Sequence, residues 1–254
     1  MNIWLSGYNG RMGQEIADLL SNDPETEVTG GSGLHYLKNN FQEKKNYTPL
    51  ELSENLAQTE LIIDFSSPEG NEALYQASLS LRVPKAFLIG TTGLNKHQRD
   101  RWKQICKESN HKLLFAPNTS LGILLTMQLS QQLAKALQPN GFDIEIVESH
   151  HKHKADSPSG TAKFLARGIC DVVPLEMVTH RTGKRQDSEL GVVALRGGSV
   201  FGEHTVKFLG EDEELVVSHR ALSRSLFAKG AIILGRWLLK QDNGTHYHLS
   251  NVTF

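Results

Sequence analysis

The sequence predicts an α/β protein of two domains, the first built on a parallel sheet and the second a smaller α+β domain with a mixed sheet. Two observations predict this fold class. Through the first half of the chain, short apolar runs of strand length alternate with helical stretches, which is typical of a parallel sheet with helices on both faces. Beyond Asn118, strand-like runs follow one another without helices between them, as in an antiparallel or mixed sheet.

Four apolar runs and one weaker run predict the strands of the first domain. The apolar runs are Asn2–Ser6, Glu60–Ser66, Lys85–Gly90 and Lys112–Ala116, and the weaker run is Glu27–Gly31. Helices are expected between these strands. The helical segments are Gln14–Asn22 with apolar residues at helical spacing, two segments that open with proline at Thr48-Pro49 and Ser67-Pro68, and a polar segment around Asp100–Glu108.

The second half of the chain begins with a long apolar helix, expected at Leu121–Leu137. The strands expected after it are Phe142–Glu148, which alternates apolar and polar residues, and then Leu190–Leu195, Val200–Leu209 and Glu214–His219. A helix is expected from Thr161, and a last long helix at Ser223–Leu239. The segment Gly33–Thr48, rich in Asn and Lys, is expected to be disordered.

The composition argues against several classes of protein. Lys and Arg number 27 against 28 Asp and Glu, and a net charge of −1 gives no general attraction to nucleic acid or to anionic lipid. No apolar stretch approaches the ~18 residues of a membrane span, and no signal-peptide pattern is seen. The two cysteines, Cys106 and Cys170, are far apart, which favours reduced thiols. We therefore expect a cytoplasmic protein that binds neither nucleic acid nor membranes.

Three glycines, Gly7, Gly10 and Gly13, lie between the first strand and the first helix. At such a turn glycine lets the backbone approach a pyrophosphate, and the helix N-terminus offers free N–H groups and a partial positive charge. Asn9 stands where the usual fingerprint has its middle glycine, and asparagine tolerates a left-handed conformation. The loop predicts a Rossmann-like dinucleotide-binding domain. The alternative is a tight turn that packs the helix on the sheet and binds nothing.

The choice between NADH and NADPH stays open at this point. An acidic residue that binds the ribose hydroxyls is expected ~20 residues beyond the glycine loop, and the stretch Thr29–His35 lacks one. Discrimination against a 2′-phosphate should therefore be weak, and Arg11, His35 or Lys38 would favour that phosphate. Both cofactors are expected to bind.

Two further loops, Gly90–Gly93 and Ala116–Ser120, follow predicted parallel strands. Open parallel sheets bind their ligands at the carboxyl ends of the strands. Taken alone, either loop fits the alternative of an ordinary turn. Because both fall in register with the glycine loop, we expect them to line the nicotinamide end of the dinucleotide site.

The segment His150–Lys154 places three histidines and two lysines in five consecutive positions after a strand. Histidine titrates near neutrality and suits a general acid. Lys154 and the helix start at Ser159–Thr161 would supply a cation and free amides to an anionic substrate. Two alternatives remain: a solvated basic loop, and a metal site on His151 and His153, near which the sequence has no cysteine.

Seven motifs occur in one order along the chain. They are Gly7–Gly13 as G-x-x-G-R-M-G, Asp64-Phe65-Ser66, Gly90-Thr91-Thr92-Gly93, Pro117-Asn118-x-Ser120-x-Gly122, Glu148-x-His150-His151-x-x-Lys154-x-Asp156-x-Pro158-Ser159-Gly160-Thr161-Ala162, Arg196-x-Gly198-x-x-x-Gly202-x-His204 and Phe227-Ala228-x-Gly230-Ala231. With these motifs the chain resembles the 4-hydroxy-tetrahydrodipicolinate reductases, also called dihydrodipicolinate reductases, and the His-His…Lys…Ser-Gly-Thr signature is specific to that family.

The resemblance implies an enzyme of lysine and diaminopimelate biosynthesis. Such enzymes use NADH or NADPH to reduce the cyclic imine formed from hydroxy-tetrahydrodipicolinate, with loss of water, to tetrahydrodipicolinate. It implies His150 as proton donor or acceptor and Lys154 as proton donor, with the small dicarboxylate substrate held by His151, Lys154, Gly160 and Thr161. The cofactor residues that it implies are Gly7, Tyr8, Asn9, Gly10, Arg11, Met12, Gly90, Thr91, Thr92, Ala116, Pro117, Asn118 and Thr119.

The resemblance also implies how the chain is divided and assembled. The dinucleotide-binding domain would be discontinuous, with residues 1–120 and 231–254, and residues 121–230 would form the substrate-binding and oligomerisation domain. The family assembles homotetramers through the sheet of that domain. The strands between Leu190 and His219 fit this expectation, because no helices alternate with them to cover the second face of their sheet.

Two other functions fit parts of the sequence. Another dinucleotide-dependent reductase or dehydrogenase of an amino-acid-derived anion would share the two-domain plan. A non-catalytic redox sensor that binds NAD(P)H would need only the glycine loop, and the dense His150–Lys154 segment argues against it.

Overall fold

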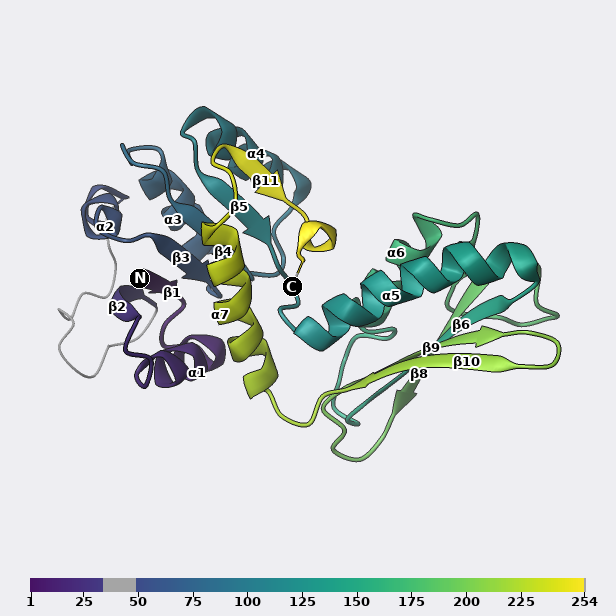
Figure 1. The fold of residues 1–254 in the computed structure, drawn as a ribbon. Helices are drawn as coiled ribbons and strands as arrows, with labels where there is room; N and C mark the ends of the chain where they lie inside the picture. The colour runs from purple at the N-terminus through teal and green to yellow at the C-terminus, as the bar shows by residue number, and fades with distance from the viewer. Residues whose placement is uncertain (34–48, 254) are drawn as a thin grey trace. The chain divides into compact units, whose positions relative to one another are not determined.

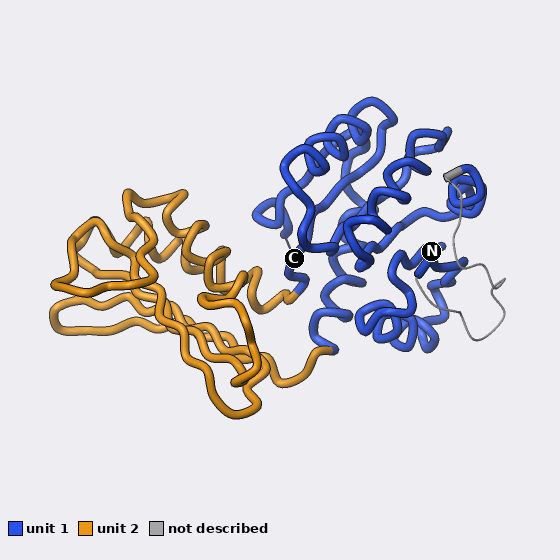
Figure 2. The backbone as a smooth tube through the Cα atoms, turned by 180° about the vertical axis from the view of Figure 1, so that it is seen from behind, with its two compact units in different colours: residues 1–119, 225–254 blue, residues 120–224 orange. Residues whose placement is uncertain are grey.

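The computed structural model describes residues 1–33 and 49–253, and the chain divides into two compact units (Figure 2). The first unit holds Met1–Thr119 and Ser225–Phe254, and the second holds Ser120–Arg224. The helix α7 (Ser225–Leu239) lies wholly within the first unit, so the expected domain boundary after residue 230 falls inside a helix.

Six parallel strands form the sheet of the first unit, in the order β11-β5-β4-β3-β1-β2. Their bounds are β1 Asn2–Ser6, β2 Glu27–Ser32, β3 Leu61–Asp64, β4 Ala86–Ile89, β5 Lys112–Phe115 and β11 Thr245–Tyr247. The chain runs from β1 to β2 in one direction and from β3 to β5 in the other, so the direction of the strand order reverses at β1. Ligands of such sheets bind at this reversal, outside the carboxyl ends of the strands.

Helices cover both faces of this sheet, as the alternating pattern predicts (Figure 1). The helices α1 (Arg11–Leu20) and α7 pack together on one face, and α2 (Pro49–Leu56), α3 (Pro68–Ser78) and α4 (Lys96–Glu108) lie on the other. The helix start predicted at Ser67-Pro68 is confirmed, because the hydroxyl of Ser67 accepts a hydrogen bond from the amide of Gly70 and caps α3. In the core, the buried ring of Trp102 on α4 packs against that of Phe87 on β4, with ring centroids 4.9 Å apart.

The second unit is a five-stranded mixed sheet in the order β10-β9-β6-β8-β7, as predicted for the second half of the chain. The strands are β6 Asp143–His150, β7 Glu176–Val178, β8 Glu189–Arg196, β9 Glu203–Leu209 and β10 Glu214–Arg220. The central strand β6 pairs parallel with β8 and antiparallel with β9. The helices α5 (Leu121–Leu137) and α6 (Gly160–Cys170) pack against one face of the sheet (Figure 1).

The alternation along β6 determines which residues face these helices. Ile144, Ile146, Glu148 and His150 are buried, whereas the residues between them are half-exposed. A strand places alternate side chains on opposite faces, so a glutamate and a histidine continue the row of core isoleucines. The other face of the sheet carries no helix within the described part of the chain.

Most expected elements are present, and the main differences are two strand bounds and four short elements that were not expected. The strand expected at Val200–Leu209 begins only at Glu203, a few residues after the turn at Gly198–Ser199. The strand expected to end at Glu148 continues to His150. The short strands β7 and β11 were not expected, nor were the 3₁₀ helices η1 (Gln138–Asn140) and η2 (Leu249–Asn251).

Some expectations concern residues 34–48, which lie outside the described residues: the disorder predicted beyond Gly33, the helix signal at Thr48, and the roles of His35 and Lys38. Within the described ranges, no helix has the length and the apolar character needed to cross a membrane.

Candidate functional site

The glycine loop turns sharply at the carboxyl end of β1. The amides of Gly7 and Tyr8 both donate to the carbonyl oxygen of Ser32 at the end of β2, at 2.7 and 3.0 Å. Gly7 has φ of +83°, and a Cβ there would lie 2.5 Å from the carbonyl oxygen of Phe65. A side chain at Gly13 would collide with the backbone of Gly7. Glycine is therefore required at both ends of the loop by close backbone approach.

The start of α1 leaves hydrogen-bond donors free for a ligand. Its N-cap, Gly10, has no side chain to cap the helix, and the first intrahelical bond runs from the amide of Gln14 to Gly10. The amides of Arg11 and Met12 therefore precede the helical ladder, where anions bind. The buried Nδ2 atom of Asn9 also has no hydrogen-bond partner among the described residues. A glycine cradle, free amides and an unpaired amide group fit the pyrophosphate of a dinucleotide.

The predicted cofactor segment after β4 is tied to the loop after β3 by a buried acidic side chain at the end of β3. Asp64 is fully buried and accepts hydrogen bonds from the hydroxyls of Ser66 at 2.5 Å and Thr91 at 2.8 Å, and from Nδ2 of Asn71 at 2.7 Å. The amide of Gly90 donates to the carbonyl oxygen of Asp64 at 2.8 Å. Asp64 thus fixes the loop after β4 relative to the loop after β3.

The remaining predicted cofactor residues follow the neighbouring strands. The segment Gly90–Thr92 follows β4, with Thr92 exposed, and the segment Ala116–Thr119 follows β5. The hydroxyl of Thr119 donates to the carbonyl oxygen of Phe227 on α7 at 2.7 Å. All the predicted cofactor residues therefore lie at the carboxyl ends of β1, β4 and β5 in the first unit (Figure 1).

The second unit places His150 at the last position of β6 rather than in the loop after it. Nδ1 of His150 lies 2.5 Å from Oε2 of Glu148, which is two residues earlier on the same face of the strand and is fully buried. Burial lowers the pKa of the His150 imidazole, while the carboxylate of Glu148 raises it in part and the charges of Lys154 and Arg196 lower it further. The net direction is downward.

Glu148 is held by two other parts of the unit. Arg196, the last residue of β8, donates from Nη1 to Oε2 at 2.9 Å and from Nη2 to Oε1 at 2.7 Å. The amide of Ser159 donates to Oε1 at 2.9 Å. Burial alone would raise the pKa of the Glu148 carboxyl, but these bonds and the one from His150 outweigh it and leave this pKa below its usual value. Glu148 is therefore a buried anion.

His204, on β9, connects this group to the start of α6. Its Nε2 lies 3.1 Å from the hydroxyl oxygen of Ser159, which is the N-cap of α6 and accepts from the amide of Ala162. The Ser159 hydroxyl therefore bridges His204 and the first turn of α6. Burial lowers the pKa of His204 to about 4, so its ring is neutral near pH 7. The rings of His150 and His204 meet edge to face at 5.1 Å.

A carboxylate already occupies the pair of groups expected to bind an anion. Oδ1 of Asp156 lies 2.7 Å from Nζ of Lys154, and Oδ2 accepts from the amide of Gly160, the first residue of α6, at 3.3 Å. The hydrogen bond from Lys154 lowers the pKa of Asp156. Nothing lies within 4 Å of a Cβ built at Gly160, so the approach to this helix start is open. Lys154 and the amide of Gly160 therefore hold a carboxylate of the protein itself.

The other predicted residues of the second unit are close in sequence to this site. His151 is half-exposed after β6, and its amide donates to the carbonyl oxygen of Val200 at 2.8 Å. Thr161 is the second residue of α6. Among residues 1–33 and 49–253 no three His, Cys, Asp or Glu side chains gather as metal ligands would.

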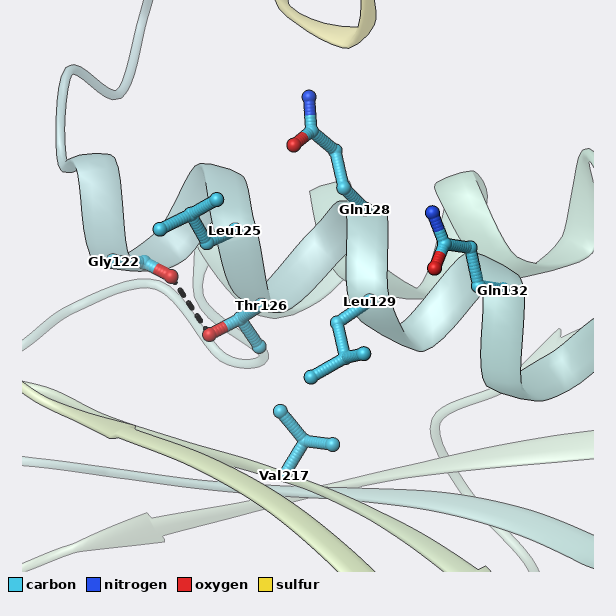
Figure 3. A pocket seen from close by; sticks show the side chains of 7 residues that line it. All are labelled: Gly122, Leu125, Thr126, Gln128, Leu129, Gln132 and Val217. Carbon is cyan, nitrogen blue, oxygen red and sulfur yellow. Dashed lines mark hydrogen bonds between the residues drawn. The ribbon is translucent and has the colours of Figure 1, made fainter. Parts of the chain in front are cut away.

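A separate open pocket lies between α5 and β10 (Figure 3). It is lined mainly by Leu125, Leu129 and Val217, with the amides of Gln128 and Gln132 beside it. It contains none of the predicted site residues.

Two family models cover nearly the whole chain. The model described as "Dihydrodipicolinate reductase, N-terminus" matches residues 1–119, and the model described as "Dihydrodipicolinate reductase, C-terminus" matches residues 122–253. The chain belongs to the dihydrodipicolinate reductase family. The family membership and the Rossmann-like fold predicted from the motifs are therefore confirmed.

Individual relatives agree with this assignment. The chain is 38% identical to the 4-hydroxy-tetrahydrodipicolinate reductase of Sulfurimonas denitrificans, covering 97% of this chain and 96% of that protein. It is also 38% identical to the enzyme of the same name from Aquifex aeolicus, covering 96% of both chains. The solved dipicolinate-bound dihydrodipicolinate reductase of Paenisporosarcina sp. has the same fold, with a TM-score of 0.77 at 21% identity over 100% of this chain and 99% of that one.

Sequence reasoning assigned no role to Glu148, Arg196, His204 or Asp64, although all four lie in the quoted motifs. The strand alternation gives one signal that was available: Glu148 and His150 are two residues apart and therefore share a face. The contact with Arg196 gives no such signal, since 48 residues separate Arg196 from Glu148.

We predict that Gly7→Ala weakens dinucleotide binding at least about tenfold, because the new Cβ meets Phe65 and the positive φ costs about 1–2 kcal/mol. Gly141→Ala is the matched control: Gly141 has φ of +85° and nothing within 4 Å of its Cβ. It should lower the melting temperature without changing affinity. Fluorescence titration with NADPH measures the Kd of both variants. An unchanged Kd for Gly7→Ala would contradict the binding of the dinucleotide by the glycine loop.

Proposed function

We propose that this chain catalyses the NAD(P)H-dependent reduction of 4-hydroxy-tetrahydrodipicolinate to tetrahydrodipicolinate in diaminopimelate and lysine biosynthesis. In this reaction a hydride and a proton are taken up, and water and the oxidised dinucleotide are released. Family membership supports the reaction, and one observation on this chain carries it: the carboxylate of Asp156 lies between Lys154 and the amide of Gly160. The groups that hold this carboxylate would hold a carboxylate of the substrate once the Asp156 side chain has moved away.

The residues would divide the work as follows. Gly7–Met12, Gly90–Thr92 and Ala116–Thr119 would hold NADPH or NADH, which supplies the hydride when bound. His151, Lys154, Gly160 and Thr161 would hold the two carboxylates of the substrate.

His150 and Lys154 would supply the proton. Hydride addition to the unsaturated ring leaves a basic atom, and a placed acid protonates it as it forms. We also propose that the first unit acts as the dinucleotide domain and the second unit as the substrate domain. The enzyme would work in the cytoplasm, where reduced dinucleotides are made.

A redox sensor that only binds NAD(P)H is the second candidate function. Such a sensor would need the first unit alone. A sensor function does not explain why Lys154, the start of α6 and the His150–Glu148 pair lie close together in the second unit. The kinetics of variants in this segment separate the two functions.

We predict that His150→Gln lowers kcat and kcat/KM together by about 10²–10⁴-fold, because it removes an acid that acts only in the transition state. Lys154→Ala should lower kcat and also raise KM, since Lys154 would hold a carboxylate of the bound substrate. The affinity for NADPH should survive both changes. Steady-state kinetics with matched NADPH titrations measure this, and Lys184→Ala, in an exposed loop of the same unit, is the control. Turnover within about threefold of the wild type in both variants would contradict the catalytic roles of His150 and Lys154.

We predict use of both cofactors without a strong preference for NADH. The described end of β2 at Ser32 and Gly33 has no carboxylate to repel a 2′-phosphate, and Arg11 is exposed at the first position of α1. Dissociation constants for NADH and NADPH test this. A preference for NADH above about a hundredfold, about 2.7 kcal/mol, would contradict it.

We propose a homo-oligomer, most simply a tetramer, formed through the sheet of the second unit. Val193, Leu195 and Val216 lie on the face of the sheet opposite to the helices and are 51%, 52% and 47% exposed. Exposed apolar residues on one face mark an interaction surface, and an identical subunit can cover it.

Light scattering should give about four times the 28.2 kDa mass of the chain. Leu195→Glu should reduce this mass, whereas Leu79→Glu, an equally exposed leucine in the first unit, should not. A wild-type monomer at micromolar concentration would end the proposal.

A further inference from the structure

We propose that Glu148 is the positioning residue for proton transfer: it fixes the His150 ring through Nδ1 and leaves Nε2 as the nitrogen that exchanges a proton with the substrate. Arg196 holds Glu148 in place for this task. The catalytic consequence rests on the proposed function, whereas the state of the His150 ring can be measured without it.

The four bonds to Glu148 account for all of its acceptor capacity. A carboxylate has about four lone-pair directions. Oε1 accepts from Nη2 of Arg196 and the amide of Ser159, and Oε2 accepts from Nη1 of Arg196 and from Nδ1 of His150. Rotation of the carboxylate would break several of these bonds at once. It is therefore a rigid reference point for the His150 ring.

The same arrangement decides which tautomer His150 adopts. An ionised carboxylate only accepts hydrogen bonds, so Nδ1 of His150 must carry a proton and donate it to Glu148. Nε2 has no hydrogen-bond partner among the described residues, and the backbone of Gly202 passes so close that a Cβ there would lie 2.9 Å from it. Any side chain at residue 202 would crowd this nitrogen. Nε2 is therefore the atom left for the substrate.

The charge of Glu148 also acts on the proton affinity of the ring. The groups that face His150 are Glu148 on its own strand, Arg196 on β8, His204 on β9 with His219 beyond it on β10, and Lys154 in the following loop. Burial, Lys154 and Arg196 lower the pKa of His150, and Glu148 alone raises it. Without the anion, His150 would lose its proton at a lower pH.

The first test is ¹⁵N NMR of histidine-labelled protein, with the His150 signal assigned by its loss in His150→Gln. In the wild type, neutral His150 should carry its proton on Nδ1. Glu148→Gln should lower the pKa of His150 by about one unit or more, and Arg196→Gln should raise it, since the cation that opposes protonation is gone. Opposite shifts support the proposal. An Nε2–H tautomer in the wild type, or a pKa of His150 that neither variant moves, would overturn it.

The second test is a double-mutant cycle in the reductase assay. Glu148→Gln should lower kcat about 10- to 100-fold with a smaller change in KM, and the alkaline limb of its pH profile should move to lower pH. In the His150→Gln background the same substitution should cost less than about threefold, because Glu148 acts through His150. A merely structural role would lower kcat equally in both backgrounds and would overturn the proposal.

Glu145→Gln is the matched control, because Glu145 is an ion-paired glutamate of the same strand that faces the other side of the sheet and contacts Arg181. It should leave the pKa of His150 and kcat unchanged. If Glu148→Gln does not fold, the direction in which Arg196→Gln shifts the pKa of His150 decides the test. A wild type without substrate-dependent NADPH oxidation would refute the proposed function, and the NMR result would still decide the role of Glu148.

Discussion

A buried negative charge that must be paired organises the second unit. Glu148 has no access to water, and removing one partner of such a buried pair typically costs about 3–5 kcal/mol. Its partners come from three separate places: His150 at the end of β6, Arg196 at the end of β8, and the amide of Ser159 before α6. Pairing this one charge therefore brings a proton-carrying ring and a helix N-terminus together before any ligand arrives, which is the preorganisation that catalysis requires.

The first unit also holds loops in place through a buried acidic side chain. Asp64 ends the central strand β3, is fully buried, and gathers the side chains of Ser66, Asn71 and Thr91 around its carboxylate. Nδ2 of Asn71 donates to Asp64 and its Oδ1 accepts from the indole of Trp102, so the network reaches into the apolar core. In each unit a buried acidic side chain at or near the end of a central strand holds a segment that carries predicted binding residues.

The fold could be predicted where local patterns are long and regular. The helix Leu121–Leu137 has the bounds that its apolar spacing predicts, and the buried strands β3, β4 and β5 lie within their apolar runs. The strand β11 was missed because Thr245–Tyr247 is three residues long and polar in sequence, and only its pairing with β5 makes it a strand. The motifs located His150, Lys154 and the glycine loop. They did not show that Glu148 is ionised and buried, because that depends on Arg196, which local sequence patterns cannot place beside it.

The central test is the oxidation of NADPH and of NADH by the purified wild-type protein, with substrate generated in situ from aspartate semialdehyde and pyruvate by an added aldolase-type enzyme that condenses the two. If the chain catalyses the proposed reaction, the reduced cofactor is lost only when substrate is present, one equivalent for each tetrahydrodipicolinate formed. We also expect dipicolinate, a dicarboxylate whose aromatic ring does not accept the hydride, to inhibit this oxidation in competition with the substrate. Binding of NADPH with no substrate-dependent oxidation of either cofactor would contradict the account and would favour a sensor.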